Sequence, residues 1–247
     1  MPRTVARAAC LALALTITAC ASPPPHTEIP FDHAAAPDIK TIGVASPSFP
    51  PGPSAVLASS AATYAGGGLV GGLARMVAAG MQADREAAMA KLLADQNFDA
   101  KAVFTKSLQA AIESRGYHTV LVSPMRESPE LFAAGDGFKG QPAADAYLDV
   151  VVVHYGYIAS GLGDSRPYRP MIHLSCRLLS KDLKQVMMFD SVLVNPLGTP
   201  DDAVQVPPPA DYAFVDTPSL SADPPRTVEG IQAAIDLSTD TIGKLVN

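Results

Sequence analysis

A run of apolar residues near the middle of the chain constrains the fold most strongly. Between Tyr147 and Ile158 the sequence contains Leu148 and four successive valines at positions 150–153. Side chains of a strand point alternately to its two faces, so a strand that is apolar at consecutive positions is buried on both of them. The sequence therefore predicts a central strand of a sheet at residues 147–158.

Two segments that follow this strand are expected to pair with it in an antiparallel meander. Residues 171–179 alternate in polarity, and residues 186–194 return after a polar turn at residues 180–184. One face of the first segment carries Ile172, Leu174, Cys176 and Leu178, and the other carries His173, Ser175 and Arg177. In the second segment Met187, Phe189 and Leu193 share one side. Cys176 is therefore expected in the core.

Other periodic segments predict helices and strands on either side of the meander. Strands are expected at residues 38–45 and 119–122, and helices at 82–95, at 97–112 with a stop at Gly116, and at 227–246. The last helix is amphipathic and should cover one sheet face. The expected fold is an α/β (α+β) domain over residues 38–247, with a mixed sheet of about five strands and helices packed on it.

Two segments interrupt this pattern. Residues 54–96 form a glycine-rich, partly helical insertion, and residues 54–83 within it carry Arg75 as their one charged residue. This stretch could be a helix packed on the domain, a glycine-rich lid or a transmembrane hairpin, since its paired glycines allow close helix approach. A phosphate-binding loop is excluded because no Gly-Lys-Ser/Thr follows. Residues 196–226 are expected to form an irregular proline-rich loop, with eight prolines between positions 196 and 225.

The amino-terminal segment is typical of an export signal. Arg3 and Arg7 precede an uncharged stretch from Ala8 to Ala19, which is too short to span a membrane. Ile17-Thr18-Ala19-Cys20 resembles the lipobox of bacterial lipoproteins, which implies cleavage after residue 19 and lipidation of Cys20. Ordinary signal cleavage, which would release a soluble periplasmic protein, is the alternative. Residues 20–37 are proline-rich and predict an extended tether.

Composition excludes one class of partner and one source of stability. Removal of residues 1–19 leaves 16 basic and 24 acidic residues, a net charge of −8, so nucleic acid is not expected as a partner. Cys10 would be lost with the signal and Cys20 acylated, which leaves Cys176 as the one free thiol and no intramolecular disulfide. No cofactor is expected.

Four parts of the chain occur in a characteristic order: residues 39–45, Ser114-Arg-Gly-Tyr117, residues 146–157 and the strands around Arg177 and Asp190. This order resembles the small α/β domain of envelope lipoproteins: the curli-secretion channel lipoprotein, the penicillin-binding-protein activator lipoproteins and the TolB amino-terminal domain. The blocks His154-Tyr-Gly-Tyr157, Tyr168-Arg-Pro170 and Asn195-Pro-Leu-Gly198 also resemble a family of uncharacterised proteobacterial lipoproteins. Both insertions depart from the first group.

The sequence contains no complete catalytic motif. Ser160-Gly-Leu-Gly-Asp-Ser165 lacks the Gly-x-Ser-x-Gly spacing of serine hydrolases. A metal site would require His154, His173 and Asp190 from separate strands, without a short ligand pair. Catalytic and metal-binding residues are therefore not assigned. Tyr155, Tyr157, Tyr168 and Arg169 could form a polar aromatic binding patch for peptide or glycan, or could simply finish a sheet edge.

The sequence thus favours a non-catalytic lipoprotein with an accessory or scaffolding role in cell-envelope assembly. Its resemblance to lipoproteins and the absence of aspartate at position 21 indicate the periplasmic face of the outer membrane. Its expected partners are the membrane, through the lipid, and other envelope proteins. The alternative is a homo-oligomeric secretion or pore component in which residues 54–83 enter the membrane.

Overall fold

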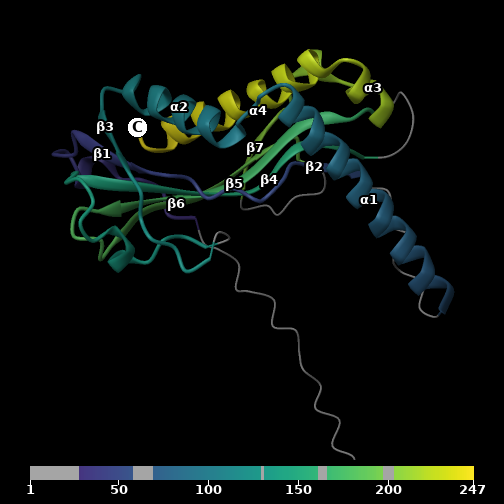
Figure 1. Cartoon of the computed structure of the whole chain (residues 1–247). Helices are drawn as coiled ribbons and strands as arrows, with labels where there is room; N and C mark the ends of the chain where they lie inside the picture. The colour runs from purple at the N-terminus through teal and green to yellow at the C-terminus, as the bar shows by residue number, and fades with distance from the viewer. Residues whose placement is uncertain (1–27, 58–68, 129–130, 161–165, 197–202) are drawn as a thin grey trace, which may run out of the picture.

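The computed structural model describes residues 28–57, 69–128, 131–160, 166–196 and 203–247, with side chains of the first long helix described from residue 80 onward. These residues form one seven-stranded sheet of order β3-β1-β4-β5-β6-β7, in which β2 also pairs with β4. Helices α2 and α4 lie on one face of the sheet, and α1 extends away from it (Figure 1). The predicted mixed α/β fold is confirmed, with more strands than the five expected.

The predicted meander is present. The central strand β4 (Ala146–Ala159) pairs antiparallel with β5 (Arg169–Ser180), which pairs antiparallel with β6 (Val186–Val194). Cys176 is fully buried on the core face of β5, as expected. In β6 the core face belongs to Met188, Val192 and Val194, so Met187, Phe189 and Leu193 share the opposite face.

The other side of β4 is lined by two short parallel strands placed end to end. β1 (Thr41–Ala45) lies between β4 and β3 (His118–Val122) and is parallel to both. β2 (Ser54–Leu57) pairs with the far end of β4, and Ser48 bridges Val151 between them. Residues 54–57 therefore belong to the sheet, which corrects their assignment to the glycine-rich insertion and to a membrane-entering segment.

Of three long helices, the second and third lie close to their predicted ranges, whereas the first begins at Leu69, well before the predicted start at residue 82. The three helices are α1 (Leu69–Asp95), α2 (Ala100–Glu113) and α4 (Pro224–Leu245). Asp99 caps α2 by accepting a hydrogen bond from the Ala102 amide at 3.0 Å, and α4 begins with two prolines, which lack the amide proton that a first turn leaves unbonded. Among the helices described, none is long and apolar enough to cross a membrane.

The hydrophobic core lies between the helices and the sheet. Phe104, Leu108 and Ile112 of α2 and Ile231, Ile235 and Ile242 of α4 are buried against the core face. Burial of one such side chain contributes about 1.5–3 kcal/mol. Packing of these two apolar stripes is thus what fixes α2 over the β1–β3 side of the sheet.

Two segments that were expected to be irregular contain ordered structure. The proline-rich region holds β7 (Val204–Val206), parallel to β6, and the short helices η4 (Ala210–Tyr212) and α3 (Thr217–Ala222), so its assignment as a structureless loop is wrong. Ile29 exchanges two 2.9 Å backbone hydrogen bonds with Phe189, and the short helix η1 (His33–Ala35) follows it. The described end of the expected tether, residues 28–37, therefore lies on the domain.

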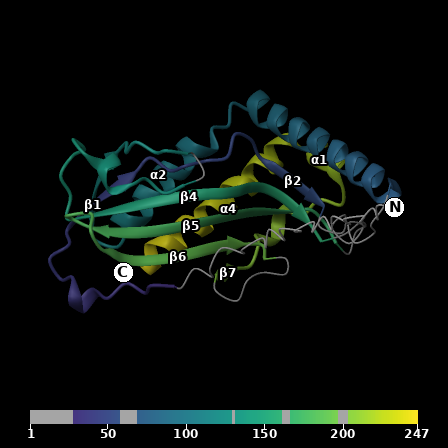
Figure 2. The ribbon, with the colours of Figure 1, turned by 90° about the horizontal axis from the view of Figure 1, so that it is seen from below.

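The second face of the sheet is covered in part by the connection between β3 and β4. This connection includes the short helix η3 (Gly135–Phe138), whose Phe138 packs on Tyr147 of β4 and on Leu179 of β5 in a second, smaller cluster. Figure 2 shows the strands β4, β5 and β6 from this side, opposite α4. The connection also carries Arg126, a charged residue that lines the candidate site.

A candidate binding cleft at the ends of β1 and β3

A cleft of about 780 Å³ opens where the parallel strands β1 and β3 end. Its walls come from the segment after β1, the start of α2, the segment after β3, and Tyr155 of β4. The lining residues are Ser46, Pro47, Ser48, Phe49, Pro50, Phe98, Asp99, Ala100, Lys101, Ser123, Pro124, Arg126 and Tyr155. In α/β sheets, ligands commonly bind in a crevice outside the carboxyl ends of the strands, so the cleft is the leading candidate site.

One wall of the cleft is aromatic and held rigidly. The Phe49 ring packs edge-on against Phe104 at 5.6 Å and against Tyr155 at 5.4 Å between ring centroids. Burial, and secondarily the charge of Asp99, raises the pKa of the Tyr155 hydroxyl, which therefore stays protonated and can donate a hydrogen bond. Prolines flank Phe49 along this wall. The wall is therefore apolar, and its side chains lose little conformational entropy when a ligand binds.

The opposite wall is the beginning of α2. Asp99 is committed to the helix cap, while Lys101 is exposed at the rim. A fixed carboxylate and a free ammonium thus border the entrance, with apolar surface below them. This combination of apolar lining and a few polar groups is usual in sites that hold a ligand in one orientation.

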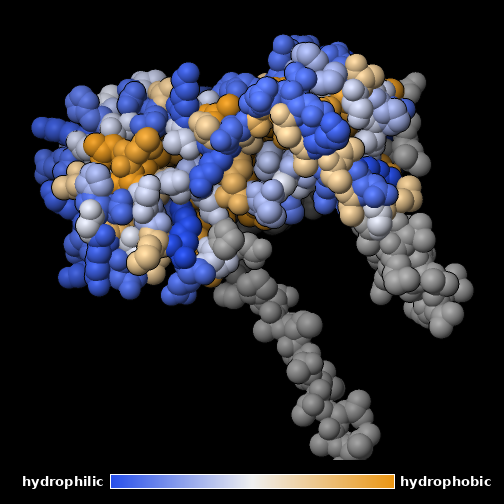
Figure 3. All heavy atoms as spheres, viewed as in Figure 1, coloured by the Kyte–Doolittle hydropathy of each residue, from blue (hydrophilic) through white to orange (hydrophobic). Residues whose placement is uncertain are grey.

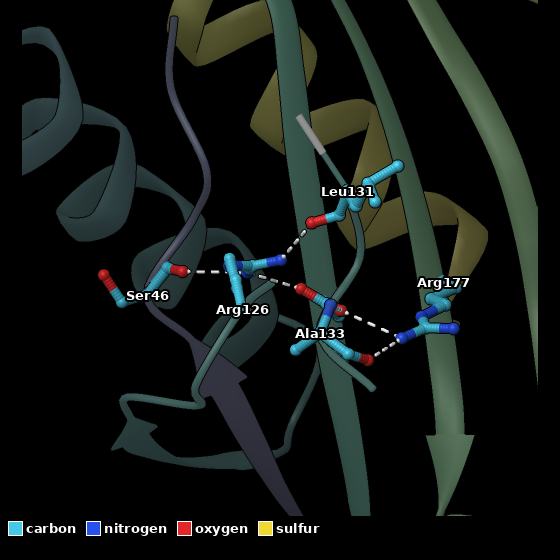
Figure 4. A network of polar contacts seen from close by, with 6 residues as sticks. Ser46, Arg126, Leu131, Ala133 and Arg177 are labelled. Atoms are coloured by element: carbon cyan, nitrogen blue, oxygen red, sulfur yellow. Dashed lines mark hydrogen bonds and ion pairs between the residues drawn. The ribbon is translucent and has the colours of Figure 1, made fainter. Parts of the chain in front are cut away.

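A buried ion network forms the floor behind Arg126 (Figure 4). The Asp149 carboxylate is fully buried; its Oδ1 lies 2.6 Å from Arg126 Nη2 and its Oδ2 lies 3.2 Å from Arg177 Nη2. Arg126 also donates to the carbonyl oxygens of Ser46 and Leu131, each at 3.0 Å. One guanidinium therefore ties the segments after β1 and after β3 to the central strand.

The same carboxylate holds the covering connection on the sheet. The Ala133 amide donates to Asp149 Oδ2 at 2.9 Å, and Arg177 donates to the Ala133 carbonyl while lying over the Phe132 ring, 4.6 Å from its centroid. A buried carboxylate is tolerated only when its oxygens are paired in this way. The network consequently fixes the shape of the cleft before any ligand arrives.

The predicted polar aromatic patch does not exist as an exposed surface. Tyr155, Tyr157 and Tyr168 are all buried, and the Tyr157 hydroxyl donates to the Thr227 carbonyl of α4 at 3.1 Å. Arg169 is half-buried on β5, on the face opposite Tyr157 and Tyr155. The physical reason is that β4 places Tyr155 and Tyr157 on the core face, beneath the helices, while Tyr168 forms a β-bridge with Phe214. Only Tyr155 reaches the cleft.

The three residues considered for a metal site are not brought together. His154 and His173 are cross-strand neighbours on the second face of the sheet, with ring centroids 6.4 Å apart. Asp190 pairs with Cys176 and therefore points to the core face. Within the described residues, no group of three His, Cys, Asp or Glu could hold a metal ion.

Some sequence predictions fall on parts of the chain outside the described residues. These are the signal peptide, lipidation at Cys20, residues 58–68 of the glycine-rich stretch considered for a lid or a transmembrane hairpin, and most of Ser160–Ser165, the segment considered for a serine hydrolase. The cleft itself was missed. A signal for it exists in the sequence, since Asp149 is a single charge inside an apolar strand and such a charge requires a buried partner.

Comparison of the chain with protein-family models and with curated proteins finds no match. The function must therefore be argued from the site itself and from the amino-terminal sequence.

Proposed function

We propose that this protein is a non-catalytic, lipid-anchored accessory protein of the bacterial cell envelope that binds a segment of another envelope protein in the β1–β3 cleft. The proposal places it on the periplasmic face of the outer membrane, held by lipid on Cys20. The observation that carries the binding role is the cleft itself, at the carboxyl ends of two parallel strands.

Three features of the cleft support a binding role. Its volume, about 780 Å³, is in the range of ligand sites and is open enough for several side chains of an extended segment. Its aromatic and proline surface suits the apolar side chains of a protein partner, since aromatic residues contribute much of the binding energy at interfaces. Lys101 adds a cation at the rim for an acidic group on that partner.

The existing contacts of Arg126 and Asp99 support a role without catalysis. Arg126 is engaged with Asp149, Ser46 and Leu131, and Asp99 caps α2. General acid–base chemistry requires a group that can reach a substrate proton. Charged groups that already hold the fold together are better suited to shaping a pocket. The alternative of a pore gains no support from residues 54–57, which form β2 of the sheet.

The test is site-specific photo-crosslinking of the full-length protein in cells. A photoreactive amino acid replaces Lys101 at the cleft rim, and a matched one replaces Lys106, which is exposed on the same helix but does not line the cleft. We expect a defined adduct with another envelope protein from position 101 and little from position 106. Equal adducts at both positions, or none at position 101, would contradict a binding cleft.

A charge reversal refines the test. Lys101→Glu should weaken copurification of the crosslinked partner, whereas Lys106→Glu should leave it unchanged. Both side chains are exposed, so thermal unfolding of the two variants should match that of the wild type. Loss of copurification with Lys106→Glu as well would indicate a general charge effect instead of a specific contact.

A further inference from the structure

The outer edge of β3 is an open edge of the sheet. β3 pairs with β1 in an unbroken parallel register from Thr41–His118 to Ala45–Val122, and no other described strand pairs with it. The opposite side of the sheet differs, because β6 is covered by β7 over Val192–Val194 and by Ile29 at Phe189. The outer edge of β3 is closed by its own chain only at its end, where the Gln141 side-chain amide accepts from the Ser123 amide at 2.8 Å and donates to the Ser123 carbonyl at 3.1 Å.

The hydrogen-bonding groups on this edge can be identified from the register. The His118 amide donates to the Lys40 carbonyl at 2.8 Å, and the Val122 carbonyl accepts from the Ser46 amide at 2.7 Å, so alternate residues from His118 face β1. In a parallel pair the amide and carbonyl of one residue point to the same side. The backbone groups of Thr119 and Leu121 therefore point outward.

The side chains of this edge lack the usual protection. Exposed edge strands generally carry lysine, proline or a bulge that prevents pairing with another chain. β3 has the sequence His-Thr-Val-Leu-Val, without lysine or proline, and its register has no bulge. Leu121 is 51% exposed, and Figure 3 shows hydrophobic surface at the end of the molecule where β1 and β3 lie.

We propose that β3 pairs antiparallel with β3 of a second copy of this chain, in a two-fold symmetric dimer whose axis passes Val120. Thr119 of each copy then lies opposite Leu121 of the other, and these are the two residues whose backbone groups point outward. Each such pair exchanges two hydrogen bonds, so the outward groups of both residues are satisfied in both copies. The register is self-complementary, so a second copy supplies every partner that these outward groups need.

The symmetry also fits attachment to one membrane, a point that rests on the proposed lipid anchor. A two-fold axis perpendicular to the sheet keeps equivalent atoms of the two copies at equal height along that axis. Both amino-terminal tethers therefore leave at the same level, as anchors in a single lipid surface must. A pair of five-residue strands is small for a stable interface, and anchoring in one membrane raises the effective concentration of the partner.

Disulfide trapping in native membranes tests the dimer. At the axis, Val120 faces its own counterpart in a non-hydrogen-bonded pair, where the separation of about 4.5 Å between Cα atoms suits a disulfide. We expect Val120→Cys to form a covalent dimer with mild oxidant about tenfold faster than Ser221→Cys, an exposed control on α3 away from β3. The wild type should not react, since Cys176 is fully buried and the proposed lipid occupies Cys20.

A second variant distinguishes strand pairing from random collision. Leu121→Lys, added to Val120→Cys, places a charge on the edge and should reduce trapping to the rate of the Ser221→Cys control, while thermal unfolding changes little because this side chain is half exposed. Equal trapping rates for Val120→Cys and Ser221→Cys, or persistent trapping with Leu121→Lys, would overturn the dimer. Adducts of Val120→Cys to a different protein would instead assign the edge to that protein.

The trapping result is separate from the proposed function. Fractionation of the same samples reports whether the protein is anchored, and the Lys101 crosslink reports whether the cleft binds. A membrane-bound protein without trapping at position 120 overturns the dimer and leaves the anchor and the cleft standing.

Discussion

At the scale of single residues, Asp149 determines the shape of the candidate site. Its two arginine partners come from segments far apart in the chain, and one of them, Arg126, lines the cleft. The carboxylate is fully buried, so its charge is supported by these guanidiniums and by the Ala133 amide. The exposed Lys91–Asp95 pair on α1 provides a contrast, because water already solvates both of its members.

The first prediction compares these two ion pairs. Asp149→Ala should lower the free energy of unfolding by about 3–5 kcal/mol, because two arginines would remain partly buried without their partner. Asp95→Ala should cost under about 1 kcal/mol, as is usual for exposed pairs. Urea unfolding monitored by circular dichroism measures both values. A loss of similar size in the two variants would show that the Asp149 network does not support the fold.

The second prediction concerns pH. Burial, and then the neighbouring His154, lowers the pKa of His173 from its ordinary value of 6.5. The unfolded chain therefore takes up a proton at a higher pH than the folded protein does. The stability that neutral His173 contributes is complete above pH 6.5 and is lost as the pH falls through this value toward the lower folded pKa.

His173→Gln should consequently flatten the decrease in melting temperature between about pH 7.5 and about pH 5.5, the range in which an ordinary histidine titrates. His118→Gln is the matched control, since His118 is exposed on β3 and should leave the profile unchanged. Differential scanning calorimetry at several pH values gives the profile. Parallel curves for the wild type and His173→Gln would contradict the assignment.

At the scale of elements, patterning predicted the long segments and the five-residue strands β1 and β3, and it missed the shorter strands β2 and β7. β4, β5 and α4 each bury an apolar face over nine or more residues, so their periodicity is visible in the sequence. β2 and β7 contain four and three residues and are held mainly by pairing with a longer neighbour. Such short strands have too few residues to show a period, and their location depends on the tertiary fold.

The difference between local patterns and tertiary contacts also explains which features of the candidate site were predicted from the sequence. The buried position of Cys176 followed from alternation along one strand, which is a local property. The cleft depends on the register between β1, β3 and β4 and on Arg126 reaching Asp149, and no local pattern specifies these contacts. Tyr155 and Tyr157 were expected at the surface because tyrosine often borders sheets, whereas the helices that cover them were placed only by the fold.

A third prediction tests how β2 is held on the sheet. Gly156 of β4 has φ +135°, and a Cβ there would lie 2.1 Å from the Ser54 carbonyl oxygen. Gly156→Ala should therefore displace β2 and lower the free energy of unfolding by about 1–3 kcal/mol or more. Gly140→Ala is the control, since Gly140 also has a positive φ, of +77°, but nothing lies within 4 Å of its added Cβ.

Chemical denaturation of the two glycine variants gives the comparison. The cost of Gly140→Ala reports backbone strain alone, so the excess cost of Gly156→Ala reports the close approach of β2 together with the stronger strain at φ +135°. Equal costs would mean that β2 does not need this contact. Hydrogen exchange at the Ala55 and Leu57 amides should increase in Gly156→Ala, because these residues lie in the β2–β4 pairing.

At the scale of the whole molecule, the proposed anchor and residues 28–37, which lie on the domain, together limit how far the cleft can lie from the membrane. Ile29 bonds β6, and the Tyr117 hydroxyl lies 3.2 Å from His33 Nε2, so the chain joins the domain before residue 37. Only the residues from 20 to 27 then separate the lipid from the domain. An extended chain of that length reaches at most about 30 Å, so the domain must stay close to the lipid surface.

The last prediction tests the anchor on which this geometry depends. Cys20→Ser should abolish incorporation of labelled palmitate and move the protein from the detergent phase to the aqueous phase in a Triton X-114 separation, because acyl chains contribute roughly 0.8 kcal/mol per buried methylene. Cys176→Ala keeps the proposed lipidation site and should retain both label and partition, although it removes the buried thiol. Label that persists in Cys20→Ser would refute lipidation at this residue. Loss of label with retained membrane association would instead mean that another part of the chain holds the membrane, and the reach of about 30 Å would no longer apply.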